Sequence, residues 1–358
     1  MPLRERGIDV EFAVMHQRTT GVADEAQQLT RVHYLDGSRR SNLKKLRSLL
    51  RTKHHDLVHT TLFEADLLGR AASLRTGIPV LTSLVNTTYD ASRLDDPNIR
   101  RSRLAAARLI DGVSGRVFTD HWHAISETVA RSATDKLHVS RNKITVIPRG
   151  RDRQRLGVRS DERRSQVRAR LGVSDDSIML LSVGRQEYQK GQVYAIEALA
   201  LLRQHLPNVY LFVAGRDGNA TASIHSAIAS NGCAESVSLL GHTDDVPDLL
   251  VAADLLVFPS LYEGLGGTLI EAMALGTPIV TSDLDVTREV TAGSAKLVRS
   301  GDPAAIADGV RAVLSDAGLR ASMAKGGRQQ FSERFELGAV MDATATMMRR
   351  IAASTDPQ

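Results

Sequence analysis

The stretch FPSLYEGLGGTLIEAMALGTPIV, residues 258–280, joins a strand, a glycine-rich loop and a helix. A buried strand is predicted to end at Ser260, and a helix to begin near Thr268. Three glycines stand just ahead of that helix, namely Gly264, Gly266 and Gly267. Glycines in this position let backbone N–H groups approach an anion, and the positive end of the helix dipole adds to the attraction. The stretch therefore predicts an anion site at a helix N-terminus.

Two glutamates bracket this loop. Glu263 precedes the glycines, and Glu271 is expected in the first turn of the helix. A carboxylate repels a phosphate, so the useful role for each is to accept hydrogen bonds from hydroxyl groups, such as those of a sugar and a ribose on either side of the phosphates. An ordinary strand, turn and capped helix is the alternative interpretation.

A second loop, SVGRQEYQKGQ at 182–192, also follows a predicted strand. The strand ends at Gly184, and Arg185 and Lys190 follow. Arginine can make paired hydrogen bonds to a phosphate, and lysine supplies a point charge. Basic loop residues can also simply be solvated. Both loops, however, follow the carboxyl ends of strands, where open α/β sheets bind ligands.

Strand-like and helix-like segments alternate along most of the chain. Predicted strands in the first half are 8–14, 56–61, 78–85, 123–126 and 144–148, and those in the second half are 178–184, 209–215, 237–241, 255–260 and 278–282. Helical spacing between the strands indicates parallel sheets built from βαβ units. We expect two Rossmann-like domains, residues 1–150 and 151–328, with a helical tail at 329–358 packing back on the first.

Composition narrows the function classes. The chain has 358 residues, of which 42% are hydrophobic and 24% charged, typical of globular proteins. No apolar run is long enough to span a membrane, and no signal peptide is expected at the N-terminus. With Cys233 as the only cysteine, a disulfide within the chain is excluded and the cytoplasm is the expected compartment.

Charge is unevenly distributed. Residues 1–150 hold 24 Lys and Arg against 16 Asp and Glu, whereas 151–358 hold 22 against 25. The basic half could contact an anionic membrane surface at the inner face of the plasma membrane, or be an ordinary solvated surface. Aromatic residues make up only 4%, so nucleic acid is not expected as a partner.

Other chemical sites find little support. The sequence GLGGTL does not match the dinucleotide fingerprint, and neither a Walker A motif nor a metal-ligand spacing occurs. His121 and His123 flank Trp122 just before a predicted strand, where packing or acceptor contact is expected rather than metal binding. Cys233 has no basic partner nearby in the sequence and is expected to be structural.

Together, VGRQEYQKG, FVAGRDG, VSLLGHTDDVPDLLVAADLLVFPS and EGLGGTLIEAMALGTPIV resemble the retaining glycosyltransferases of family 4. The resemblance is close over about 170–300 and extends to HAISETVARSA and ITVIPRGRD in the first half. It implies the GT-B fold, in which two Rossmann-like domains face each other across a cleft. It also implies transfer of a sugar from a nucleotide sugar, UDP- or GDP-linked, without a metal or other cofactor.

The resemblance assigns roles to particular residues. Arg185 and Lys190 would hold the donor diphosphate, Glu263 would lie near the donor sugar, and Glu271 would bind the ribose hydroxyls. The remaining donor-binding residues implied are Gly184, Gly215, Arg216, Gly264, Leu265, Gly266, Gly267 and Thr268. The retaining reaction of the family is described as attack on the anomeric carbon from the side of the leaving phosphate, which assists deprotonation of the acceptor.

The sequence departs from the family pattern in its first half. Asn86 stands where a histidine is common, and Arg149 where asparagine is common. The first strand and its glycine loop are expected to be lacking, because the chain opens on LRERG followed at once by a strand. On the acceptor side, Asn86, His121 and His123 are the expected residues.

We therefore expect a retaining hexosyl- or N-acetylhexosaminyltransferase acting on a glycan, a lipid-linked saccharide or a small molecule, in cell-envelope or polysaccharide synthesis. A catalytically inactive nucleotide-sugar-binding relative is the main alternative. An epimerase of the same fold is less favoured, because no clear set of acid and base residues is found.

Overall fold

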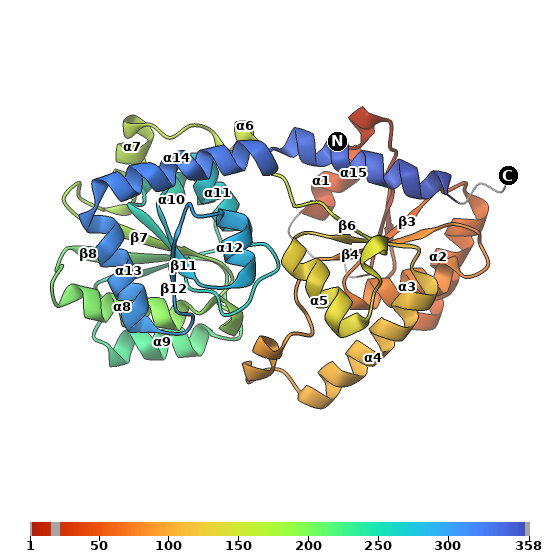
Figure 1. Ribbon diagram of the computed structural model, residues 1–358, viewed down its shortest axis with the longest axis horizontal. Coiled ribbons are helices and arrows are strands. Elements are labelled where there is room, and N and C mark those ends of the chain that lie inside the picture. The colour runs from red at the N-terminus through yellow and green to blue at the C-terminus, as the bar shows by residue number, and fades with distance from the viewer. Residues whose placement is uncertain (1, 16–21, 355–358) are drawn as a thin grey trace. The chain divides into compact units, whose positions relative to one another are not determined.

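A computed structural model describes residues 2–15 and 22–354 (Figure 1). It divides into two compact units. The first comprises 1–90, 100–148 and 338–358, and the second comprises 91–99 and 149–337. The sequence had assigned all of 1–150 to one domain. The structure instead places 91–99 with the second unit, where polar contacts hold the segment.

The second unit is built on a six-stranded parallel sheet in the order β12-β11-β10-β7-β8-β9. Its strands are β7 (Ile178–Val183), β8 (Val209–Ala214), β9 (Val237–Gly241), β10 (Leu255–Phe258), β11 (Ile279–Ser282) and β12 (Lys296–Val298). This is the order of a doubly wound sheet, and the chain reverses direction across the sheet between β7 and β10. A ligand site is expected outside the carboxyl ends of those two strands.

Helices cover both faces of this sheet. One face carries α8 (Gln192–Arg203), α9 (Thr221–Ser230) and α13 (Pro303–Ser315). The other carries α7 (Asp161–Leu171), α10 (Val246–Ala252), α11 (Gly267–Leu275), α12 (Asp285–Thr291) and α14 (Ala317–Arg334). The core under the first face is almost entirely apolar, with Ile196, Leu211 and Val310 fully buried. Burial of both sheet faces explains why these strands read as continuous apolar runs.

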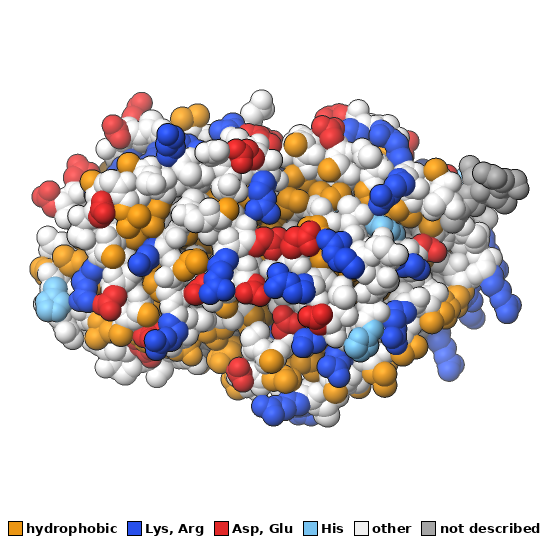
Figure 2. Space-filling view, viewed as in Figure 1, with side chains coloured by type: hydrophobic (Ala, Val, Ile, Leu, Met, Phe, Trp, Pro, Cys, Tyr) orange, Lys and Arg blue, Asp and Glu red, His pale blue; other side chains and the backbone are white. Residues whose placement is uncertain are grey.

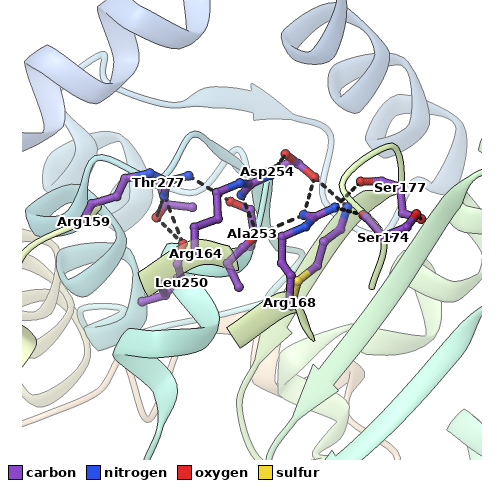
Figure 3. A network of polar contacts seen from close by, with 11 residues as sticks. Arg159, Arg164, Arg168, Ser174, Ser177, Leu250, Ala253, Asp254 and Thr277 are labelled. Carbon is purple, nitrogen blue, oxygen red and sulfur yellow. Dashed lines mark hydrogen bonds and ion pairs between the residues drawn. The ribbon is translucent and has the colours of Figure 1, made fainter. Parts of the chain in front are cut away.

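The polar stretch 149–168 follows the last strand of the first unit and contains no strand of its own. It forms α6 (Arg153–Leu156) and most of α7, and its arginines are structural. Arg168 is 1% exposed and donates to the carbonyl oxygens of Ala252 and Ser174, while Arg164 binds Asp254 at 2.6 Å (Figure 3). The Asp254 carboxylate also accepts from the backbone N–H of Met179 at 2.7 Å. The network thus fixes α7 to the start of β7.

The first unit contains a four-stranded parallel sheet in the order β3-β4-β5-β6. The strands are β3 (Val58–Thr61), β4 (Val80–Leu84), β5 (His121–Ala124) and β6 (Ile144–Val146). One face carries α2 (Arg39–Thr52), α3 (Phe63–Ser73), α4 (Arg101–Phe118) and α5 (Glu127–Leu137). Short 3-10 helices lie at Arg4–Arg6 and Arg141–Lys143 in this unit, and at Ala91–Asp95 and Tyr188–Lys190 in the second.

Two further strands, β1 (Phe12–Val14) and β2 (Val32–Tyr34), pair in parallel as a separate sheet, with α1 (Val22–Leu29) between them. Among the described residues, β1 pairs only with β2, and β3 only with β4. The expectation that a central strand is lacking between them stays a prediction. The sequence reasoning missed β2 and β12, which are three-residue strands at sheet edges.

The C-terminal helices belong to different units. α14 packs on α11 in the second unit, and α15 (Leu337–Ala353) packs in the first unit. Val340, Met347 and Ile351 of α15 form one apolar cluster with Leu81 of β4 and Ile147, the residue after β6. The segment assigned to the first unit thus begins at Gly338, later than the residue 329 expected from the sequence.

Candidate functional site

Two loops meet at the carboxyl ends of β7 and β10. The first runs from Gly184 to Gly191, and the second from Pro259 to Gly266. Gly191 has a φ of +60°, and a Cβ there would lie 2.1 Å from the Pro259 carbonyl oxygen. Only glycine fits this close approach, so the contact between the two loops requires a glycine at position 191. The two sequence motifs therefore come together at the switch point of the sheet.

The loop after β8 joins the same edge. Gly215 has a φ of +152°, and a Cβ on it would lie 1.9 Å from the Gly184 carbonyl oxygen. The side chain of Gln192 donates to that same oxygen at 3.0 Å. Gly184 and Gly215, both expected at the donor site from the sequence, thus lie against each other beside the β7 loop, and both are half-buried.

Lys190 and Glu263 form an ion pair across the two loops. Glu263 is 8% exposed, and its Oε1 also accepts from the Ser260 hydroxyl at 3.2 Å. The Lys190 ammonium lies 5.6 Å from the centre of the Phe258 ring. A buried carboxylate requires such partners, because an unpaired charge in the interior is costly. The pair provides a fixed cation and a hydroxyl acceptor side by side.

The other two basic residues predicted for the donor lie differently. Arg185 donates to Glu187 at 2.9 Å, and its side chain is 59% exposed. Arg216 is exposed, and its carbonyl oxygen accepts from the backbone of Gln186 at 3.0 Å. Both therefore stay at the rim of the site, with guanidinium groups accessible to solvent.

The glycine-rich loop ends at the N-terminus of α11. Gly266 is the residue before the helix and has a φ of +79°. Gly264, Leu265 and Gly266 are buried, whereas Gly267 and Thr268 are half-buried. The first N–H groups of a helix have no partner within the helix. Those of Gly267 and Thr268 therefore lie where the sequence predicts an anion site, and that assignment stays a prediction.

Glu271 lies in the second turn of α11, so its expected place in the first turn is wrong. The helix begins one residue earlier than expected, at Gly267, because Gly266 takes the left-handed conformation at its start. Glu271 is half-buried, and its Oε1 accepts from Arg151 at 2.6 Å. Its second carboxylate oxygen keeps its capacity to accept hydrogen bonds.

Arg151 is a site residue that sequence reasoning missed. Its guanidinium lies over the start of α11, where a Cβ on Gly267 would lie 2.2 Å from Nη2. Its backbone is fixed to the segment after α14, because its N–H donates to the Phe335 carbonyl at 2.8 Å. Burial lowers the pKa of the neighbouring Arg149, and the charge of Arg151 adds to this. The signal in the sequence was a basic residue just after a strand.

The β10 loop is supported by contacts to Tyr262 that sequence reasoning also missed. Tyr262 is 5% exposed and donates its hydroxyl to Asp96 at 3.0 Å. The Arg93 guanidinium lies 5.6 Å from the centre of the Tyr262 ring, and Gln189 donates to the Tyr262 carbonyl at 2.8 Å. Burial raises the pKa of Tyr262, and the Asp96 carboxylate adds to the effect. Segment 91–99 thus fixes the residue next to Glu263.

The expected acceptor-side residues all lie in the first unit. Asn86 follows β4, and its side-chain oxygen accepts from the backbone N–H of Thr87 at 2.9 Å. His121 and His123 lie within β5, not before a strand as expected, because the strand starts two residues earlier. They share the face of the sheet opposite to Trp122, which is buried.

Hydrogen bonds link these histidines to neighbouring strands. His123 Nδ1 is 2.8 Å from the Ser83 hydroxyl, which is 2.7 Å from His59 Nε2. His123 Nε2 donates to the Ile147 carbonyl at 2.7 Å, so neutral His123 accepts from Ser83. His121 binds Thr145 at 2.7 Å, and burial together with the charge of Arg350 lowers its pKa.

The described residues contain no group of three or more His, Cys, Asp or Glu side chains that could hold a metal ion. No helix in the described part of the chain is long and apolar enough to cross a membrane. Cys233 is buried and its pKa is raised by burial, in keeping with a structural role.

Two protein families match this chain. The family "Glycosyl transferases group 1" matches residues 163–330, and "Glycosyltransferase Family 4" matches residues 3–155. The D-inositol 3-phosphate glycosyltransferase of Salinispora arenicola is 30% identical over 77% of this chain and 64% of its own length. The chain spans roughly 60% of the length of three curated relatives that it matches.

Solved structures share the fold. HepE of Anabaena, in complex with UDP and glucose, matches with a TM-score of 0.81 over 95% of this chain and 98% of its own, at 20% identity. Sucrose-phosphate synthase from Thermosynechococcus elongatus matches with a TM-score of 0.82 over 99% of this chain and 91% of its own, at 21% identity. Given its two Rossmann-like units with parallel α/β sheets and the two family matches, the chain belongs to the family 4 glycosyltransferases of the GT-B fold.

Proposed function

We propose that this chain transfers a sugar from a nucleotide sugar to a hydroxyl group of an acceptor, with retention of the anomeric configuration. The observation that carries the proposal is the ion pair between half-buried Lys190 and buried Glu263, beside the N-terminus of α11 at the switch point of the second unit. Cation, carboxylate and free helix N–H groups are what a sugar diphosphate needs, since each meets a different part of it.

The donor diphosphate binds the N–H groups of Gly267 and Thr268 in this proposal. Lys190 approaches from the β7 loop, and Arg185 swings from Glu187 at the rim to reach the phosphate. Glu263 accepts from hydroxyl groups of the donor sugar, and Glu271 accepts from the ribose through its second oxygen. The backbone at Gly184 and Gly215 and the exposed Arg216 border the base.

In the reaction, the bond between the anomeric carbon and the diphosphate oxygen breaks, and a bond to the acceptor oxygen forms on the same face. The acceptor proton passes to the departing phosphate. Lys190 and the α11 N-terminus stabilise the negative charge that develops there, a contribution of about 3–4 kcal/mol per well-placed donor in other enzymes. In other enzymes a metal ion stabilises this charge, and we propose that no metal is needed here.

The substrates are proposed more narrowly from the relatives. UDP-linked hexose is the first donor to test, because HepE is solved with UDP and with UDP-glucose, and GDP-linked sugars are the second. The acceptor is a saccharide, a lipid-linked saccharide or a small polyol, contacted in the first unit by Asn86, His121 and His123. From its excess of basic residues, we also propose that the first half contacts an anionic membrane surface.

The test is a transfer assay with the purified chain. Nucleotide release from UDP-, GDP- and ADP-sugars is followed with and without a panel of acceptors, and NMR of the product reports the anomeric configuration. We expect transfer with retention that persists in EDTA. Loss of transfer in EDTA, restored by magnesium or manganese, would refute the metal-free site. Nucleotide binding without transfer or donor hydrolysis would identify an inactive relative.

A further inference from the structure

The helix α4 exposes an unusual row of large apolar side chains. Leu109 is 68% exposed, Ile110 49%, Val113 48% and Val117 65%. Leu109, Val113 and Val117 follow one another at intervals of four residues, and Ile110 stands three residues before Val113, so the four lie along one side of the helix. The row runs about 12 Å, at the rise of an α-helix. We call Leu109, Ile110, Val113 and Val117 the α4 stripe.

Arginines flank the α4 stripe on the same helix. Arg101, Arg103, Arg108 and Arg116 are all exposed. In the part of the chain that the structure describes, no ion pair joins them to a carboxylate. The sole acidic residue of α4, Asp111, is buried and engaged by Arg70 at 2.7 Å. Over α4, the space-filling view shows Lys and Arg side chains interleaved with hydrophobic ones (Figure 2).

Helix stability does not explain these charges. Arg100, Arg101 and Arg103 stand at the N-terminus of α4, and its first turn holds no acidic residue. Cations are unfavourable at the positive end of a helix dipole. Exposed apolar side chains are likewise unfavourable in water. Both features become favourable against a surface that is negatively charged and apolar beneath, which is the character of an anionic bilayer.

A cavity of about 310 Å³ opens beside the stripe, between α4 and the end of α5. Arg108, Arg116, Lys136 and His138 are among its lining residues, and Asp135 is the one acidic residue among them. The C-terminal carbonyl groups of α5 also contribute negative charge at this edge. The three full positive charges of Arg108, Arg116 and Lys136 outweigh these negative charges, so the cavity favours an anionic group such as a lipid phosphate.

We infer that α4 is the membrane-docking surface of the chain, with the α4 stripe inserted among the lipids and the arginines on anionic headgroups. The inference rests on the proposed membrane contact of the first half and locates it. A second copy of the chain fits the surface less well, because a symmetric contact through α4 would bring arginines against arginines.

The test is co-sedimentation of the purified full chain with vesicles. Binding is expected to vesicles of equimolar phosphatidylglycerol and phosphatidylcholine, to weaken in high salt, and to be far weaker with phosphatidylcholine alone. Arg108→Gln with Arg116→Gln should weaken binding roughly 5- to 30-fold, since each arginine near an anionic surface adds about fivefold. Leu109→Ser with Val117→Ser should weaken it at least as much.

Two matched controls make the result specific. Arg39→Gln with Arg40→Gln removes two exposed arginines from α2, which carries none of the large exposed apolar residues of the described chain. Val158→Ser removes an apolar side chain that is 80% exposed in the second unit. Both controls should bind vesicles like the parent chain, and circular dichroism should show every variant folded.

Three results would overturn the inference. Equal loss of binding in the α2 control would mean diffuse charge attraction, and unchanged binding in the α4 variants would exclude the surface. A dimer by light scattering that the stripe variant converts to monomer, without vesicle binding by the parent, would assign the stripe to a second copy. Transfer to a water-soluble acceptor should be unchanged in the α4 variants, so failure of this inference and failure of the proposed reaction are distinguishable.

Discussion

Replacing Glu271 with alanine tests the nucleotide end of the proposed site. In the structure, one carboxylate oxygen of Glu271 accepts from Arg151 at 2.6 Å, and the second is proposed to accept from the ribose. Loss of a hydrogen bond to a charged group costs about 1.5–3 kcal/mol, which corresponds to a roughly 10- to 150-fold weaker binding of UDP.

The structure places the expected value toward the lower end of that range. Glu271→Ala also leaves Arg151 without its carboxylate, beside the N-terminus of α11 where the diphosphate is proposed to bind. The released positive charge should attract the phosphates and offset part of the loss. Glu271→Gln keeps an acceptor oxygen and should fall between the alanine variant and the parent chain.

Glu336 offers a matched control. It accepts from Arg153 Nε at 2.6 Å, the same geometry as the Glu271–Arg151 pair, on the same unit. Glu336→Ala should leave UDP affinity unchanged in isothermal titration calorimetry. Unchanged affinity in a folded Glu271→Ala variant would refute the ribose assignment, and an equal loss in Glu336→Ala would show that the effect is structural.

Three further predictions concern packing and titration. Tyr262→Phe removes a hydrogen-bond donor from the buried Asp96 carboxylate, so the free energy of unfolding in urea should fall by about 1–3 kcal/mol and the KM for the nucleotide sugar should rise. A variant that matches the parent chain in both measurements would exclude Asp96 as a support of the loop. Gly191→Ala places a Cβ 2.1 Å from a carbonyl oxygen in the β10 loop, whereas the Cβ of Gly232→Ala, also at positive φ, meets no atom within 4 Å. UDP affinity should therefore fall in Gly191→Ala alone. An equal fall in both variants would mean that backbone strain accounts for the whole effect. Burial raises the pKa of Asp66 to about 7, above its value of 3.8 in the unfolded chain, so this carboxyl contributes stability at low pH that is lost as pH rises toward 7. The free energy of unfolding of Asp66→Asn should therefore rise by about 2–3 kcal/mol relative to that of the parent chain between pH 5 and pH 8. A difference between the two chains that stays constant with pH would refute the shift.

Much of the second unit could be predicted because its strands are buried on both faces and read as apolar runs bounded by glycine. Gly191 and Gly215 also stand where the backbones of two loops approach each other closely. The short strands β2 and β12 carry no such run, because each has only three residues and is only partly buried. Helix starts are equally hard to fix, and a one-residue difference at Gly267 moved Glu271 to the second turn.

The contacts that sequence reasoning missed join distant segments. Arg151 and Glu271 are 120 positions apart, and Asp96 and Tyr262 are 166 apart. No periodicity connects such pairs, because each depends on how the chain returns to the sheet edge. The local chemistry of the loops was thus predictable, whereas the side chains that orient Glu271 and support the β10 loop were visible only in the fold.

A crystal structure of the chain grown with UDP tests the central claim most directly. We predict the diphosphate against the N–H groups of Gly267 and Thr268, within reach of Lys190, and the ribose hydroxyls on the free oxygen of Glu271. UDP bound away from the carboxyl ends of β7 and β10, or with its ribose turned away from Glu271, would contradict the account.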